Sequence, residues 1–326
     1  MEAQTRKMPI GIQDFAKLRA GDYLYVDKTA FVYQLAQTMN PYFLSRPRRF
    51  GKSLFLSTLK YYFLGEKELF EGLKVAELEK DWIKYPVFHI EFNIESYADV
   101  NSLNQALESN LSILEKIWGR DVTENTYPSR FRGLIRRAAE KTGQRVVVLV
   151  DEYDKPLLAS MNNEQLSDEF RTILKGFYGV LKGEDANLRF AFLTGVTKFS
   201  KVSIFSDLNQ LDDISMERRY AEICGISETE LKTNFTPDIA NLAHANNISV
   251  EETFAKLKRR YDGYHFSRDQ EGVYNPFSLL NTLNKLEFGN YWFATGTPTF
   301  LVKMLKGAKL DVAKLEGDTR IDALSI

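Results

Sequence analysis

The chain carries the sequence Ser45-Arg46-Pro47-Arg48-Arg49-Phe50-Gly51-Lys52-Ser53 between two apolar stretches. Residues 42–44 before it predict a short buried strand, and residues 52–64 predict a helix. A buried strand, a tight basic loop and a Gly-Lys-Ser that opens a helix are typical of a phosphate-binding loop. Backbone N–H groups and the helix dipole stabilise an anion there. The sequence therefore predicts an anion site at this loop.

Two side chains of the loop have the chemistry that a nucleoside triphosphate needs. Lys52 can reach the β- and γ-phosphates, and the Ser53 hydroxyl can ligate Mg²⁺. The match to the general motif G-x-x-x-x-G-K-[ST] is incomplete, because Arg46 occupies the first glycine position. We expect at least one loop arginine to bind phosphate or to act across a subunit interface; the alternative is a solvated basic loop. The predicted nucleotide-binding residues are Arg46, Arg48, Arg49, Phe50, Gly51, Lys52, Ser53 and Leu54.

A second motif follows at Asp151-Glu152, which closes the apolar run at residues 146–150. Such a β-branched run is typical of a central parallel strand. The arrangement has the Walker B form, in which Asp151 would hold Mg²⁺ and Glu152 would act as general base on the attacking water. The alternative is that both carboxylates only cap a helix after the strand.

The next predicted strand ends in Leu193-Thr194-Gly195. In P-loop ATPases with a strand inserted between the two Walker motifs, this position carries a polar sensor of the γ-phosphate. We predict that Thr194 has this catalytic role, with Thr197 as the second candidate; the alternative is a threonine that caps a turn.

The rest of the chain alternates predicted strands and helices up to about residue 226, which favours an α/β sheet with right-handed connections. The remaining strands are expected at residues 86–94, 146–150, 188–194 and 220–224, and the helices between them at 101–118, 129–141 and 167–181. After residue 226 short helices are expected at 228–233, 236–245, 249–261, 278–286 and 299–305, with a turn at 295–298. We therefore predict two domains, 1–226 and 227–326, and expect a further domain beyond Ile326.

Composition restricts the class of protein. The 326 residues contain 43 Lys and Arg against 44 Asp and Glu, so no global basic excess attracts nucleic acid or an anionic membrane. The single cysteine, Cys224, excludes an internal disulfide and fits a reducing cytoplasm. No apolar stretch predicts a secretory signal or a membrane span. We expect a cytoplasmic protein without membrane contact.

Long motifs in the chain resemble those of the predicted AAA-ATPase-like proteins, a group of bacterial P-loop ATPases. The resemblance lies in residues 46–53, 150–156, 193–205, 261–266, 274–278 and 291–298. It implies a three-layer P-loop NTPase core with a mostly parallel, AAA-like sheet, followed by a smaller helical, winged-helix-like lid. The phosphate loop of this family begins Arg-Pro-Arg-Arg, so Arg46 agrees with the family. Members often continue into a PD-(D/E)XK nuclease domain, and no such pattern follows Leu305 here.

These features predict a Mg²⁺-dependent ATP hydrolase that acts as a conformational switch or motor for an attached or partner effector. One alternative is a nucleic-acid-binding module regulated by nucleotide, because residues 256–260 form a basic cluster in the C-terminal region. Another is a nucleotide-bound scaffold that does not hydrolyse ATP. The expected partners are ATP, further copies of the chain, and DNA or an effector protein at the C-terminal region.

Overall fold

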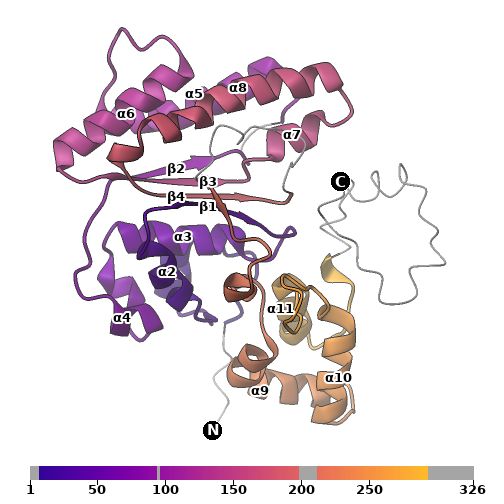
Figure 1. Ribbon diagram of the computed structural model, residues 1–326. Helices are drawn as coiled ribbons and strands as arrows, with labels where there is room; N and C mark the ends of the chain where they lie inside the picture. The colour runs from indigo at the N-terminus through magenta and orange to yellow at the C-terminus, as the bar shows by residue number, and fades with distance from the viewer. Residues whose placement is uncertain (1–6, 94–95, 198–210, 293–326) are drawn as a thin grey trace.

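A computed structural model of the chain describes residues 7–93, 96–197 and 211–292. Its centre is a five-stranded sheet in the order β2-β3-β4-β1-β5 (Figure 1). All strand pairs in it are parallel. The predicted α/β class with a mostly parallel sheet is confirmed. The strands are β1 (Pro41–Ser45), β2 (Val87–Glu91), β3 (Val146–Asp151), β4 (Leu188–Gly195) and β5 (Asp212–Asp213).

Strand β3 lies between two neighbours and under helices on both faces, and every one of its residues is buried. A strand with two covered faces needs apolar side chains on both, which explains its unbroken valine and leucine run. Burial of each such side chain stabilises the fold by about 1.5–3 kcal/mol. The run ends at Asp151, where the strand reaches the carboxyl edge of the sheet.

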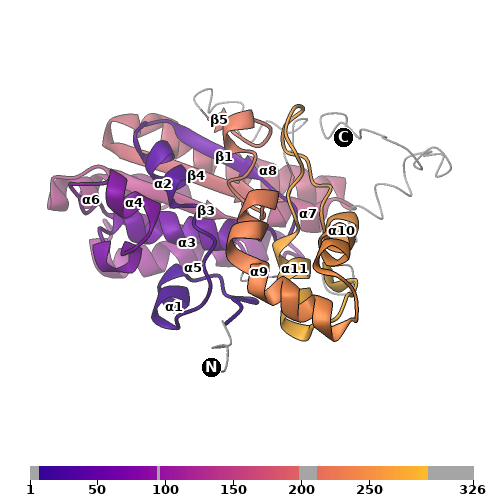
Figure 2. The same ribbon diagram turned by 90° about the horizontal axis from the view of Figure 1, so that it is seen from below.

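Helices cover both faces of the sheet, giving three layers (Figures 1 and 2). One face packs against α5 (Val100–Trp118), α6 (Tyr127–Thr142) and α8 (Glu164–Gly183), with α7 (Lys155–Ser160) at its edge. The other packs against α3 (Lys52–Phe63), supported by the N-terminal helices and a short 3-10 turn. These are α1 (Phe15–Ala20), α2 (Thr29–Ala36), α4 (Lys74–Leu78) and η1 (Lys67–Phe70).

Local sequence sets the ends of the long helices. Asp99 before α5 and Thr126 before α6 each form a capping box with a serine three residues later. Each box satisfies N–H groups that the first helical turn leaves without a partner. Gly143 ends α6 in a left-handed conformation with φ of 66°.

Within the described residues, three further helices follow the sheet and pack against the N-terminal segment: α9 (Glu228–Ala245), α10 (Val250–Tyr261) and α11 (Pro276–Lys285). Their apolar core includes Leu24, with Met8 and Ile10 against it. Two isolated antiparallel bridges, Ile226–Tyr274 and Tyr264–Val273, join the connections between these helices. The helical character of this region is as predicted, whereas the winged-helix assignment stays a prediction.

Two predicted elements were wrong. Residues 220–224 form no strand: η3 (Arg218–Tyr220) comes first, and Ile223 N–H then closes a turn on the Tyr220 carbonyl. The edge strand is instead the two-residue β5, which is too short and too acidic to give an apolar pattern. The predicted break at residues 234–235 is absent, because the buried face of Leu231, Phe235, Ile239 and Leu242 holds α9 together through Pro237.

The predicted helix at 299–305 and the turn at 295–298 lie outside the described residues. Within the described part of the chain, no helix is long and apolar enough to cross a membrane.

The exposed Pro237 inside α9 gives a stability prediction. Proline removes an intrahelical hydrogen bond and crowds the preceding turn, and its side chain here has no buried contacts to lose. Pro237→Ala should raise the free energy of unfolding by about 1–3 kcal/mol in urea titrations. Lys232→Ala, at an exposed site on the same helix, should stay within about 0.5 kcal/mol of the wild type. A Pro237→Ala protein that is no more stable than the wild type would contradict this account.

Candidate functional site

The loop between β1 and α3 contains two left-handed residues. Gly51, which precedes α3, has φ of 95°, and Arg49 has φ of 67°. Glycine adopts such angles without steric cost, whereas an arginine keeps them only under constraint from its surroundings. A Cβ built on Gly51 would meet no atom within 4 Å, so backbone conformation and not space requires glycine here. The loop thereby enters α3, whose first-turn N–H groups have no intrahelical acceptor.

The ammonium group of Lys52 lies inside this loop. Lys52 is 5% exposed, and its Nζ donates to the carbonyls of Arg46 at 2.9 Å and Pro47 at 3.2 Å. Burial lowers the pKa of this ammonium, while the negative charges of Asp154, Glu152 and Asp151 raise it. The loop therefore holds a buried cation that faces the carboxyl end of β3.

Asp151 ends β3 as a buried carboxylate whose orientation is fixed from β4. The Thr194 hydroxyl donates to Asp151 Oδ1 at 2.5 Å and accepts a long bond from the Glu152 N–H at 3.4 Å. Thr194 itself has no exposed surface. Thr194, the predicted sensor, is therefore buried and hydrogen-bonded to Asp151, the predicted metal ligand. This geometry favours an orienting role for Thr194 over the predicted contact with the γ-phosphate.

Glu152 leaves the strand through a left-handed turn with φ of 52°. Its Oε2 lies 4.0 Å from Lys155 Nζ, which also donates to the Asn93 carbonyl at 3.2 Å. A non-glycine residue in this conformation is strained, and such strain is found where the backbone must aim a side chain. In this protein the strained residue is Glu152, whose side chain lines the same cavity as the phosphate loop.

Several predicted residues meet at one cavity of ≈ 470 Å³. Arg48, Arg49, Gly51, Lys52, Ser53 and Leu54 line it from the loop, and Glu152 from the end of β3. The remaining wall consists of Pro9–Gln13, Asn93, Lys155, Pro276, Phe277 and Leu280. The cavity therefore lies between the phosphate loop, the N-terminal segment and α11.

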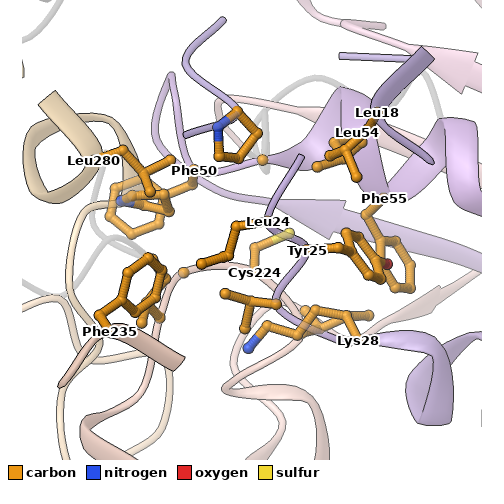
Figure 3. A pocket seen from close by; sticks show the side chains of 17 residues that line it. Leu18, Leu24, Tyr25, Lys28, Phe50, Leu54, Phe55, Cys224, Phe235 and Leu280 are labelled. Carbon is orange, nitrogen blue, oxygen red and sulfur yellow. The ribbon is translucent and has the colours of Figure 1, made fainter. Parts of the chain in front are cut away.

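A second, apolar cavity of ≈ 90 Å³ adjoins the first (Figure 3). The two share the wall residues Pro9, Gly51, Leu54, Pro276 and Leu280. Figure 3 shows Phe50, Leu280 and Phe235 on one side of the apolar cavity and Tyr25 and Phe55 on the other. Tyr25, which precedes β1 in the sequence, thus lies in the wall of the apolar cavity.

The side chain of Arg46 lies away from both cavities. It is 1% exposed and donates to the backbone carbonyls of Ser215 and Tyr220. A guanidinium in this position does not contact a ligand in the cavity, so its predicted place among the nucleotide-binding side chains does not fit the geometry. Phe50 also points away from the larger cavity and packs against Tyr264 and Phe266.

Asp154 is a buried residue near the site for which the sequence motifs predicted no role. Asp154 is completely buried, and its Oδ2 accepts from the N–H groups of Val196 and Thr197 at 2.8 Å and from the Thr197 hydroxyl at 3.1 Å. Its Oδ1 has no hydrogen-bond partner among the described residues. Burial raises the pKa of this carboxyl to about 6. The available signal was the second aspartate of Asp-Glu-Tyr-Asp, three residues after Asp151.

Gly195 leaves room for this arrangement. A Cβ on Gly195 would lie 2.5 Å from the Tyr153 ring and 3.0 Å from the Asp154 Cγ. The Tyr153 hydroxyl in turn donates to the Thr197 carbonyl at 3.0 Å. The ends of β3 and β4 are therefore joined by side chains as well as by the sheet.

The predicted metal ligands Ser53 and Asp151 carry oxygen atoms of the kind that bind Mg²⁺. Mg²⁺ is held by one or two protein oxygens together with water and substrate phosphates, and Ser53 and Asp151 are of this kind. Among the described residues, no group of three or more His, Cys, Asp and Glu side chains could hold a metal by itself. The donor set therefore suits a metal that arrives with a phosphate ligand.

Comparison with known proteins agrees with this geometry. The sequence model described as Predicted AAA-ATPase matches residues 9–205, more than half of the chain. The chain is a member of the predicted AAA-ATPase family. It is also similar to a protein of Azotobacter chroococcum mcd 1 described as an uncharacterized protein in the vnfD 5'region. The two are 46% identical over 321 residues, 98% of this chain and 60% of that protein. The chain thus spans about three fifths of this relative, whose name states no activity.

The raised pKa of Asp154 predicts a pH effect on the stability of this AAA-ATPase-like protein. With a pKa of about 6 against an ordinary 3.8, the folded state binds an extra proton between those pH values, so stability falls as pH rises through this window. Asp154→Asn removes this ionisation and should flatten the fall by up to about 3 kcal/mol. Urea unfolding at a series of pH values measures the difference, and parallel profiles for the two proteins would contradict it.

Proposed function

We propose that the chain binds ATP across the two adjoining cavities and hydrolyses it. The observation that carries this proposal is the buried Lys52 ammonium, held by loop carbonyls and facing the carboxylates at the end of β3. The hydrogen bonds of this ammonium go to neutral loop carbonyls, and the oxygens of a polyphosphate would give it charged acceptors. The family membership supports the same ligand.

The two cavities suit the two halves of the nucleotide. The larger cavity has Arg48, Arg49, Lys52 and Ser53 in its wall, which favours the triphosphate. The apolar cavity beside it has Leu54, Leu280 and Pro276 in its wall, which favours the adenine ring. Because the cavities share wall residues, one ligand can occupy both.

Each residue of the site has a separate role in the proposed hydrolysis. Glu152 accepts a proton from the water that attacks the γ-phosphorus, and the bond from that phosphorus to the bridging β–γ oxygen breaks to give ADP and phosphate. Lys52 stabilises the negative charge on the phosphoryl oxygens. Mg²⁺, held by Ser53 and Asp151, would supply further positive charge at these oxygens. Thr194 keeps Asp151 in orientation.

The contacts of α11 support a role as a conformational switch. Pro276, Phe277 and Leu280 belong to this helix and line the site, so the presence of nucleotide bears directly on the C-terminal helices. An effector or a second copy of the chain would respond to that change.

The basic cluster of α10, considered as a DNA contact, is partly engaged within the protein. Lys256 and Arg260 lie over the Phe288 ring, and Lys258 lies 4.0 Å from Glu228. These contacts favour a structural role for the cluster, so DNA binding is the less supported function.

Phosphate release by purified protein tests the assignment of Glu152. Glu152→Gln keeps the shape of the side chain and removes its basicity, so it should bind ATP and turn over at least about a hundredfold more slowly than the wild type. Glu164→Gln, an exposed change at the start of α8, is the control and should keep the wild-type rate. Wild-type turnover in Glu152→Gln would remove Glu152 from the mechanism. ATP retention without turnover in the wild type would instead favour the scaffold.

A further inference from the structure

The side chain of Arg46 is among the largest completely buried groups in the described part of the chain. Its Nη1 donates to the carbonyls of Ser45 at 2.8 Å and Ser215 at 2.7 Å, and its Nη2 donates to the Tyr220 carbonyl at 3.0 Å. All three hydrogen-bond acceptors are neutral backbone groups. Burial of a charge with no carboxylate among its hydrogen-bond partners costs stability, so it needs a compensating reason.

The backbone of Arg46 connects this buried guanidinium to the phosphate site. The Arg46 N–H donates to the Gly195 carbonyl at 3.2 Å, and the Arg46 carbonyl accepts from Lys52 Nζ at 2.9 Å. The backbone of Arg46 is therefore hydrogen-bonded to β4 through its N–H and to Lys52 through its carbonyl. Its carbonyl is one of the two loop groups that position the Lys52 ammonium.

The Arg46 side chain also contacts the C-terminal region, through Phe266. The guanidinium lies over the Phe266 ring at 3.9 Å, and Phe266 also packs against Phe50 of the loop, with ring centroids 5.6 Å apart. A guanidinium that stacks on an aromatic face is attracted by the ring quadrupole, and this attraction is stronger away from water. The planar guanidinium can stack and bridge carbonyls at the same time, which a lysine ammonium cannot do.

Neighbouring loop residues contact the same region. The Trp292 indole N–H donates to the Arg48 carbonyl at 3.0 Å, and the Gly225 N–H donates to the Phe50 carbonyl at 3.2 Å. Arg49 lies over the Phe277 ring at 4.0 Å. The loop is thus held from its outer side by residues that follow the sheet in sequence.

We propose that Arg46 is a positioning residue: it takes the place of the glycine of the general motif, fixes the phosphate loop and Lys52 from behind, and ties them to the C-terminal region through Phe266. It does not touch the nucleotide. This inference rests on the proposed ATP site for its effect on binding, whereas its effect on the loop is independent of that site.

Arg46→Lys is the direct test, because it keeps the charge and loses the planar fork. Arg189→Lys is a matched control at the amino end of β4. Arg189 likewise donates to two carbonyls, those of Thr38 and Ala36, and lies over the rings of Phe63 and Tyr85. Both variants lose the same kind of interaction, and only one of them contacts the loop.

The first readout is backbone hydrogen exchange of residues 45–55 without nucleotide. We expect exchange about tenfold faster in Arg46→Lys and unchanged in Arg189→Lys, because local opening follows the loss of local contacts. Equal exchange in the two variants would overturn the proposal whether or not the protein binds ATP.

The second readout is ATPase kinetics. Arg46→Lys should raise KM about tenfold, the size of one lost charge-assisted hydrogen bond, and should leave kcat within about twofold, since Arg46 touches no reacting atom. Arg189→Lys should change neither value. Wild-type KM in Arg46→Lys, with a loss of stability equal to that of Arg189→Lys, would reduce Arg46 to a structural role. A wild-type protein that binds no ATP would defeat the proposed function and leave the exchange result to decide the role of Arg46.

Discussion

The ammonium group of Lys52 is buried at the start of a helix, in a loop whose remaining polar groups include three arginines. A cation in this position is stable only if carbonyls and carboxylates surround it, and the described structure provides both. The carbonyls of Arg46 and Pro47 accept its protons, and the carboxylates at the end of β3 face it. The loop around this group includes two residues in the left-handed conformation, Arg49 and Gly51.

The carboxylates in turn depend on the pairing of β3 with β4. The parallel register brings Val150 opposite Leu193, so the residues that follow each strand meet at the same edge of the sheet. Asp151 then accepts a hydrogen bond from the Thr194 hydroxyl. Asp154 accepts hydrogen bonds from the N–H groups of Val196 and Thr197. Gly195 is the residue whose missing side chain permits this contact. The orientation of the acidic groups therefore depends on the pairing of these two strands.

Sequence patterns predicted the elements whose signal is local. The apolar run before Asp151, the Gly-Lys-Ser start of α3 and the long amphipathic helices α5 and α6 all appear where their patterns indicated. Strand β5 was missed because two acidic residues pair with β1 through backbone groups alone. The break expected at residues 234–235 is absent because packing of the buried face holds α9 together and outweighs the local cost of Pro237.

The residues that line the cavity could be predicted from sequence motifs. The contacts that position the residues around them could not. Lys52, Ser53 and Glu152 line one cavity as their motifs suggested. The positions of Arg46, Thr194 and Asp154 depend on contacts with residues more than 40 positions away in the chain, which no local pattern encodes. Arg46 was expected to face the ligand and instead holds the loop from behind.

Calorimetric titration of MgATP into the wild type, Lys52→Ala and Lys60→Ala tests the central claim most directly. Lys60 lies two turns further along α3 and does not line the cavity, so its variant controls for loss of a lysine from this helix. The wild type and Lys60→Ala should bind MgATP with equal affinity, and Lys52→Ala should bind at least about a hundredfold more weakly. Absence of binding heat in the wild type, or equal affinity in all three proteins, would contradict the account.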